Sequence, residues 1–232
     1  TAIATAIANS KLLPAAVKTL IAFEPELEKH IQFAERLKDI EAVIATGSNN
    51  SSRYFDYYFS KYPHIIRRNR NSIGIVGPKA TEDELKGLGH DVFDFFGLGC
   101  RNVTKLMLPE GFDIDRFFNA IYPFHQIIEH NKYANNYDYH KALYLLNKEP
   151  LLDNGFILMR KHEQLPSALG TLHYEYYQSG DAVKNYLGEH EEEIQCVIGT
   201  EDWDPVAISP GKSQEPELWD YADGVDTIAF LR

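Results

Sequence analysis

Short apolar runs that alternate with helix-like segments constrain the fold of this chain more than any other feature. Residues 42–45 lead through Thr46-Gly47-Ser48 into the aromatic segment 53–59, and residues 72–77 lead into another helix-like segment. Each run has the length and the β-branched content of a buried strand, and a glycine-containing turn follows it. Strands that alternate with helices in this way favour an α/β protein with a largely parallel sheet.

The helix after the second of these strands has a recognisable start. Thr81 is followed three residues later by Glu84, which matches a capping box, and the helix is expected to continue through Val92 to the Gly97-Leu98-Gly99 turn. The other expected elements are two helices separated at Pro25 within 11–36, helices at 114–130 and 137–147, and strands at 103–108, 155–159 and 194–198.

Composition limits the class of protein. The chain has 232 residues, of which 44% are hydrophobic, so it can bury a full core. A formal charge of −11, with Lys and Arg scattered along the chain, argues against a nucleic-acid partner. No stretch approaches the roughly 20 apolar residues of a membrane span, and the N-terminus does not have the pattern of a secretory signal. These features predict a globular, cytoplasmic protein.

The two cysteines are interpreted separately. Cys100 follows a Gly-Leu-Gly turn and precedes Arg101. Glycines let a backbone approach a ligand, loop N–H groups can hold an oxyanion, and a positive neighbour favours the nucleophilic thiolate. We therefore expect a catalytic Cys100 with Gly99 and Arg101 as oxyanion and turn residues. The alternative for any free cysteine is a small buried hydrophobe, and Cys196, in the apolar run 194–198, is given that interpretation.

Several segments together resemble a known family. Residues 42–53, 72–76, 91–103 and 219–227 are similar to acyl-CoA reductases related to the fatty-acid reductase of bacterial bioluminescence, a branch of the aldehyde dehydrogenase superfamily. In that family a strand ending in Thr-Gly-Ser lies beside the nicotinamide cofactor, and the catalytic cysteine follows after a helix and a glycine-bearing turn. Thr46-Gly47-Ser48 and Cys100 match both features and their order. The ordinary alternative for Ser48 is a helix cap.

The resemblance implies a fold, a cofactor and a division of the chain. It implies an aldehyde-dehydrogenase-like α/β fold, in which a parallel-sheet, Rossmann-like cofactor portion adjoins an α/β catalytic domain. Residues 1–96 would be the C-terminal portion of the NAD(P)-binding domain, and residues 97–232 the catalytic domain with a C-terminal tail. Because residues 1–8 lack an initiator Met and nearly repeat small residues, we expect the cofactor domain to be N-terminally incomplete. NADPH or NADH is the implied cofactor.

Two glutamates of the family bear on direction and cofactor. The ribose-binding Glu of a Glu-x-Phe-Gly-Pro segment has its nearest counterpart in Glu163, for which a solvated surface carboxylate is the alternative. Oxidative members also have a general-base Glu before the strand at 72–76, whereas residues 65–71 contain no carboxylate. Without a base to activate water, a thioester on Cys100 would persist and accept hydride. This favours reduction of an acyl-CoA substrate.

Three other interpretations were weighed against this one. An aldehyde dehydrogenase acting in the oxidative direction is the alternative within the superfamily. Clustered aromatic residues at 54–59 and 174–177 would suit a non-catalytic binding module or a homo-oligomer interface. A metal hydrolase is disfavoured, because His125 and His130 are five residues apart and no His-Glu-x-x-His or Cys-x-x-Cys pair is present, so no metal site is expected.

Overall fold

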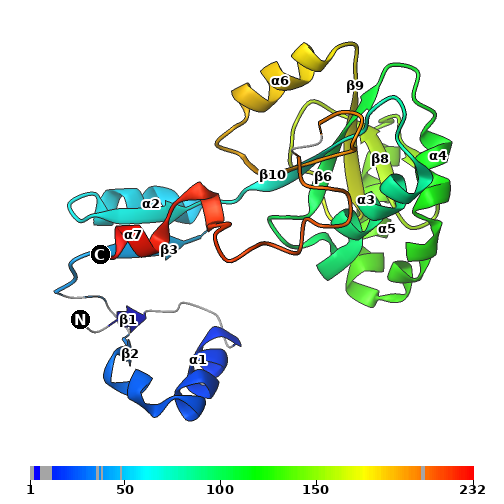
Figure 1. Cartoon of the computed structure of the whole chain (residues 1–232). Helices are drawn as coiled ribbons and strands as arrows, with labels where there is room; N and C mark the ends of the chain where they lie inside the picture. The colour runs from blue at the N-terminus through cyan, green and yellow to red at the C-terminus, as the bar shows by residue number, and fades with distance from the viewer. Residues whose placement is uncertain (1–2, 6–11, 35–36, 38, 48, 205–206) are drawn as a thin grey trace. The chain divides into compact units, whose positions relative to one another are not determined.

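A computed structural model of the chain describes residues 3–5, 12–34, 37, 39–47, 49–204 and 207–232 (Figure 1). The chain forms two compact units, Thr1–Arg68 and Asn69–Arg232. The predicted division between residues 96 and 97 falls inside the second unit, between strands that share one sheet. The separate roles expected for residues 1–96 and 97–232 stay a prediction.

The first part of the N-terminal unit pairs two short strands in parallel. Strand β1 (Ile3–Thr5) pairs with β2 (Ile31–Phe33), and helix α1 (Leu12–Phe23) and the 3₁₀ helix η1 (Pro25–Lys29) lie between them in sequence. The break at Pro25 is confirmed. The prediction of a second helix after Pro25 is wrong in extent, because η1 ends at Lys29. The residues that follow form β2, whose partner β1 is distant in sequence, and no local pattern reveals this pairing.

The second part of the N-terminal unit is a strand–helix–strand motif. Strand β3 (Val43–Thr46) leads into helix α2 (Asn49–Phe59), and β4 (His64–Arg67) returns parallel to β3. The strand and the helix expected here are both confirmed, although the helix begins four residues before the predicted start at residue 53. Strand β4 is an addition to the prediction, since two apolar residues between polar ones give only a weak strand signal.

A six-stranded sheet forms the centre of the C-terminal unit. Its order is β10-β5-β6-β9-β8-β7, and all neighbouring strands are parallel except β7 and β8. The largely parallel α/β sheet is therefore confirmed. The strands are β5 (Asn71–Ile75), β6 (Val103–Pro109), β7 (Leu152–Asp153), β8 (Leu158–Lys161), β9 (Thr171–Tyr177) and β10 (Ile194–Gly199).

The helices of this unit follow the prediction in part. At the start of α3 the Thr81 hydroxyl accepts from the Glu84 N–H (3.3 Å) and the Thr81 N–H donates to the Glu84 carboxylate (2.8 Å), so the capping box is confirmed. The helix expected at 114–130 is divided, because Pro123 cannot continue an α-helix. The helices are α3 (Glu82–Phe93), η2 (Asp94–Gly97), α4 (Ile114–Ala120), η3 (Tyr122–Glu129), α5 (Asn131–Leu146), α6 (Gly180–Glu189), η4 (Ala222–Gly224) and α7 (Thr227–Phe230).

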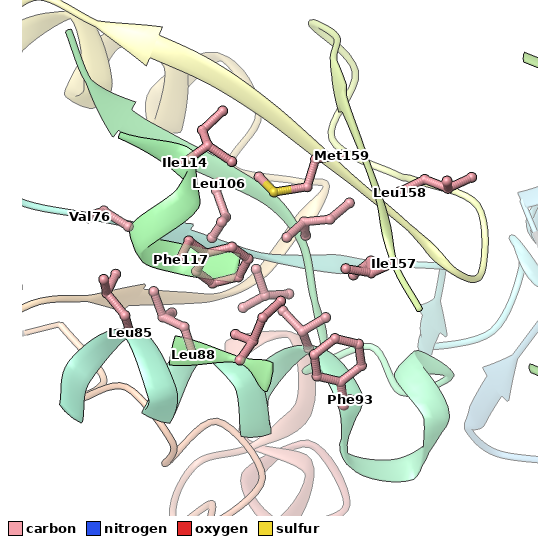
Figure 2. Close-up of a cluster of buried hydrophobic side chains, with 14 of the residues drawn as sticks. Val76, Leu85, Leu88, Phe93, Leu106, Ile114, Phe117, Ile157, Leu158 and Met159 are labelled. Atoms are coloured by element: carbon pink, nitrogen blue, oxygen red, sulfur yellow. The ribbon is translucent and has the colours of Figure 1, made fainter. Parts of the chain in front are cut away.

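Apolar side chains cover both faces of the sheet. Figure 2 shows Leu85 and Leu88 of α3 beside Phe117 of α4, and all three are fully buried in one cluster with Leu106 of β6. Met107, the next residue of β6, belongs to the second cluster on the other face, with Val183 of α6 among its members. Burying one Leu, Phe, Met or Val side chain contributes about 1.5–3 kcal/mol to the free energy of unfolding. The two clusters fix β6 and, with it, the connection from α3 that carries Cys100.

Candidate active site

Cys100 lies in the turn between η2 and β6, and its side chain is exposed. The chain reaches this turn through three successive residues with left-handed backbone, Phe95 (φ 54°), Phe96 (φ 59°) and Gly97 (φ 70°). Non-glycine residues adopt this conformation at an energetic cost. The polypeptide therefore changes direction sharply at the end of α3 and presents the thiol at the surface of this unit.

A buried asparagine holds the turn. The Asn102 Oδ1 atom accepts a hydrogen bond from the Gly99 N–H (2.8 Å), and the Asn102 N–H donates to the Gly99 carbonyl (3.1 Å). The Asn102 Nδ2 atom donates to the carbonyls of Asp91 (2.9 Å) and Asp94 (2.8 Å) at the end of α3. Asn102 is not among the residues predicted from the sequence. The available signal was a polar Asn directly before an apolar strand and three residues after a glycine, as in a side-chain-capped turn.

Two further side chains connect this turn to other parts of the unit. The Ser72 hydroxyl of β5 donates to the Cys100 carbonyl (3.0 Å), and the Ser72 N–H donates to the Asn102 carbonyl (3.2 Å). The Arg101 Nε atom donates to the Ser213 carbonyl in the C-terminal tail. Gly99 and Arg101 therefore both form hydrogen bonds within the protein. Together with the bond from Ser72, these hydrogen bonds fix the backbone around Cys100.

Cys196 has the environment expected of a structural cysteine. It lies in β10 with 6% of its surface exposed. Burial raises the pKa of the Cys196 thiol, and the positive charge of Arg101 acts in the opposite direction. Since the thiolate is the reactive form of cysteine, burial suppresses reactivity at this position. The two thiols of the chain thus differ in exposure, as the sequence predicts.

The Thr-Gly-Ser segment belongs to the N-terminal unit. Thr46 is the last residue of β3, and Gly47 follows it in the turn before α2, while Ser48 lies outside the described residues. A Cβ atom at position 47 would lie 2.8 Å from the Ser51 Cβ and 2.9 Å from the ring of Phe55. Only glycine fits such a close approach, so Gly47 lets α2 pack directly against the end of the strand.

Glu163 lies in the loop after β8, with an exposed side chain. This loop returns along the sheet, because the Thr104 hydroxyl of β6 donates to the Leu165 carbonyl (2.9 Å). Thr104 is four residues after Cys100 in the sequence. The structure therefore brings the loop that carries Glu163 to the N-terminal end of β6, which directly follows the Cys100 turn.

The described part of the chain shows neither a metal centre nor a membrane-spanning helix. No three His, Cys, Asp or Glu side chains among the described residues gather where they could hold a metal ion. None of the helices that the structure describes is long and apolar enough to cross a membrane. His125 and His130 each stack on an aromatic ring, Tyr122 and Phe96 respectively.

Comparisons with solved structures identify the fold. No protein-family model and no curated protein matches the chain. An NAD-dependent aldehyde dehydrogenase from Sinorhizobium meliloti matches over 85% of this chain and 48% of its own length, with a TM-score of 0.65 and 10% identity. A bifunctional proline utilization A protein matches over 88% of this chain and 25% of its own, with a TM-score of 0.65 and 14% identity.

A third neighbour gives the same result. A putative methylmalonate-semialdehyde dehydrogenase from Sinorhizobium meliloti 1021, solved with NAD, matches over 85% of this chain and 50% of its own, with a TM-score of 0.62 and 12% identity. The chain therefore has an aldehyde-dehydrogenase-like α/β fold, as the resemblance implies. It spans between a quarter and a half of the length of these three proteins. At these identities the likeness establishes the fold, and activity is a separate question.

Proposed function

We propose that this chain is part of an NAD(P)H-dependent acyl-CoA reductase that forms an acyl-thioester on Cys100. The observation that carries the proposal is an exposed thiol held in a turn at the start of β6, in an aldehyde-dehydrogenase-like fold. The buried alternative applies to Cys196 instead. A cytoplasmic setting suits the proposal, because thiols stay reduced there.

The proposed chemistry exchanges one thioester for another before reduction. The Cys100 sulfur attacks the carbonyl carbon of the acyl-CoA, and a new C–S bond forms as coenzyme A leaves as a thiolate and takes up a proton. NADPH or NADH, which Thr46, Gly47, Ser48 and Glu163 would hold, would supply the hydride that reduces the acyl group. The aldehyde is released when the C–S bond to Cys100 breaks and the sulfur returns as thiolate. Acyl-CoA, NAD(P)H and one proton thus give aldehyde, coenzyme A and NAD(P)⁺.

We assign Thr46, Gly47 and Ser48 to cofactor binding, together with Glu163. In support, Gly47 lets the start of α2 follow immediately after the end of β3. The N–H groups at a helix start after a parallel strand are the usual place for the phosphates of a nucleotide in α/β folds. The exposed carboxylate of Glu163 is assigned to the ribose. The NAD-bound neighbour supports the choice of cofactor.

The segment before β5 favours reduction over oxidation. Residues 65–71 contain three arginines and no carboxylate. Arg68 pairs with Asp56 (3.1 Å), and Arg70 pairs with Asp223 (3.3 Å). A segment of this charge has no group that could take a proton from water and so hydrolyse the acyl-enzyme. We therefore place the oxidative aldehyde dehydrogenase second.

The Cys100→Ala substitution tests the proposal in the whole protein that contains this chain. We expect reduction of acyl-CoA thioesters, followed by NADPH or NADH absorbance, to fall by about 10³-fold or more, because the step that forms the acyl-enzyme is lost. The matched control is Cys196→Ala, which also removes one thiol and should leave turnover intact. Undiminished turnover of the Cys100→Ala protein would disprove the assignment.

Thiol labelling separates this proposal from a binding or oligomerisation module. The aromatic side chains of Tyr54, Tyr57 and Tyr58 on α2 are exposed, by 67%, 79% and 64%, so a self-association surface there is the third candidate, after the oxidative dehydrogenase. A reductase should have one cysteine that reacts rapidly with iodoacetamide and that acyl-CoA protects. A binding module should show no protection by acyl-CoA, and its association state should change when Tyr57 is replaced by Ser.

A further inference from the structure

The loop 162–165 after β8 is held by side chains that bind its backbone one carbonyl after another. The donors lie in β6, in α6 and in β9, the strand that follows the loop. The bonds are Lys105 Nζ to His162 O (3.0 Å), Lys105 Nζ to Glu163 O (2.5 Å), Tyr186 Oη to Glu163 O (3.2 Å), His173 Nδ1 to Gln164 O (2.9 Å) and Thr104 Oγ1 to Leu165 O (2.9 Å). Four successive carbonyls therefore each accept from a side chain of the sheet or of α6.

Lys105 is the centre of this arrangement. Its side chain is fully buried, and its ammonium forms an ion pair with Glu175 and lies 4.5 Å from the centre of the Tyr186 ring. The other two hydrogen bonds of the ammonium go to the carbonyls of His162 and Glu163. A buried ammonium costs several kcal/mol unless it is paired, and here Glu175 and the two carbonyls supply that pairing, so Lys105 stays charged only while it is bonded to the loop.

Leu165 and Glu163 of the loop are anchored differently. Leu165 is buried in the second apolar cluster with 1% exposure, so hydrophobic packing secures that end. Glu163 has an exposed side chain, and its carbonyl receives two of the five bonds, from Lys105 and Tyr186. The position of the Glu163 backbone thus depends on these two donors.

We infer that Lys105, assisted by Tyr186, is a positioning residue that fixes Glu163 for its contact with the ribose of the cofactor. The inference rests on the proposed function, since it gives the buried lysine a role in cofactor affinity. It predicts that weakening either donor raises the KM for NADPH or NADH and leaves the acylation of Cys100 unchanged, because acylation requires no cofactor.

The test compares variants of the whole protein. Lys105→Met with Glu175→Gln removes the ion pair without leaving a buried charge, and the KM for the cofactor should rise about tenfold. Tyr186→Phe removes only the hydroxyl bond to Glu163, and the expected rise is about threefold. The matched control is Tyr133→Phe, which removes a tyrosine hydroxyl bond to the Phe156 carbonyl (2.9 Å) on the other face of the sheet and should leave the KM unchanged.

Two readouts separate a positioning role from a structural one. The rate at which acyl-CoA acylates Cys100 without cofactor should be the same in all variants. The Tyr186→Phe substitution should add no further rise in KM to Glu163→Ala, because Tyr186 acts through Glu163. An unchanged cofactor KM in folded Lys105→Met/Glu175→Gln protein, or in Tyr186→Phe if the former does not fold, overturns the inference. Absence of acylation in the unmodified protein instead overturns the proposed function.

Discussion

The turn that carries Cys100 and the loop that carries Glu163 are both held by buried side chains, but these side chains differ in chemistry. Both are irregular segments next to β6, and in both a buried side chain binds backbone groups that no helix or strand pairs. The turn uses the amide of Asn102, which stays neutral, whereas the loop uses the ammonium of Lys105 and the imidazole of His173. The contacts of Asn102 do not titrate, whereas protonation of His173 would place a charge in the interior beside the loop.

We expect the greatest loss of stability from a substitution at Asn102. Asn102→Leu leaves the Gly99 N–H and the carbonyls of Asp91 and Asp94 without this partner, so we expect the free energy of unfolding to fall by about 4 kcal/mol. Urea denaturation measures it. The control is Asn135→Leu on an exposed position of α5, where a change within about 0.5 kcal/mol is expected. A comparable small change at Asn102 would show that the amide does not hold the turn.

The second effect is a pH dependence of the free energy of unfolding, which the buried His173 should cause. Burial lowers the pKa of His173 from 6.5 to about 4, so the unfolded chain binds a proton between these values while the native protein does not. Stability from this residue is therefore complete above pH 6.5 and is lost as pH falls toward 4, by about 3 kcal/mol. Unfolding of His173→Gln and unmodified protein should be compared at pH 7 and pH 4. Parallel pH profiles of the two proteins would refute this source of acid sensitivity.

The weakest effects on stability are expected when one hydroxyl is removed from each of the two regions. Ser72→Ala removes the bond to the Cys100 carbonyl (3.0 Å), and Ser167→Ala removes a bond to the Thr171 carbonyl (2.7 Å) just after the loop. Each should lower the free energy of unfolding by about 1 kcal/mol. Only Ser72→Ala should change the rate at which iodoacetamide modifies Cys100. Equal labelling rates in both variants would mean that Ser72 has no influence on the thiol.

Local signals account for the parts of the fold that the sequence predicts. The capping box at Thr81 is a contact between residues three apart, and the apolar runs at 72–77, 103–108 and 194–198 are complete within a few residues. Strand β9 escaped prediction because it places His173 and Glu175, both polar, within the sheet, where their partners Gln164 and Lys105 come from other elements. Such inward polar residues disguise the apolar alternation of a strand.

The candidate site, like the fold, was predictable only where local sequence determines the structure. The glycines around Cys100 are adjacent in sequence, so an exposed thiol in a turn could be inferred. Asn102, Ser72 and Lys105 could not be assigned, since each acts on backbone groups whose position depends on tertiary packing. An exposed cysteine in a glycine-rich turn is therefore easier to predict from the sequence than the side chains that hold the turn in place.

The left-handed stretch at Phe95 and Phe96 also restricts how this sequence can diverge. Side chains branched at Cβ collide with the backbone at positive φ, whereas Gly, Asn and Asp tolerate it. Over evolutionary time, Val, Ile and Thr should therefore be excluded from positions 95 and 96, however well they would suit the local hydrophobicity. The left-handed backbone before Cys100 thus limits which substitutions homologous proteins can tolerate at these two positions.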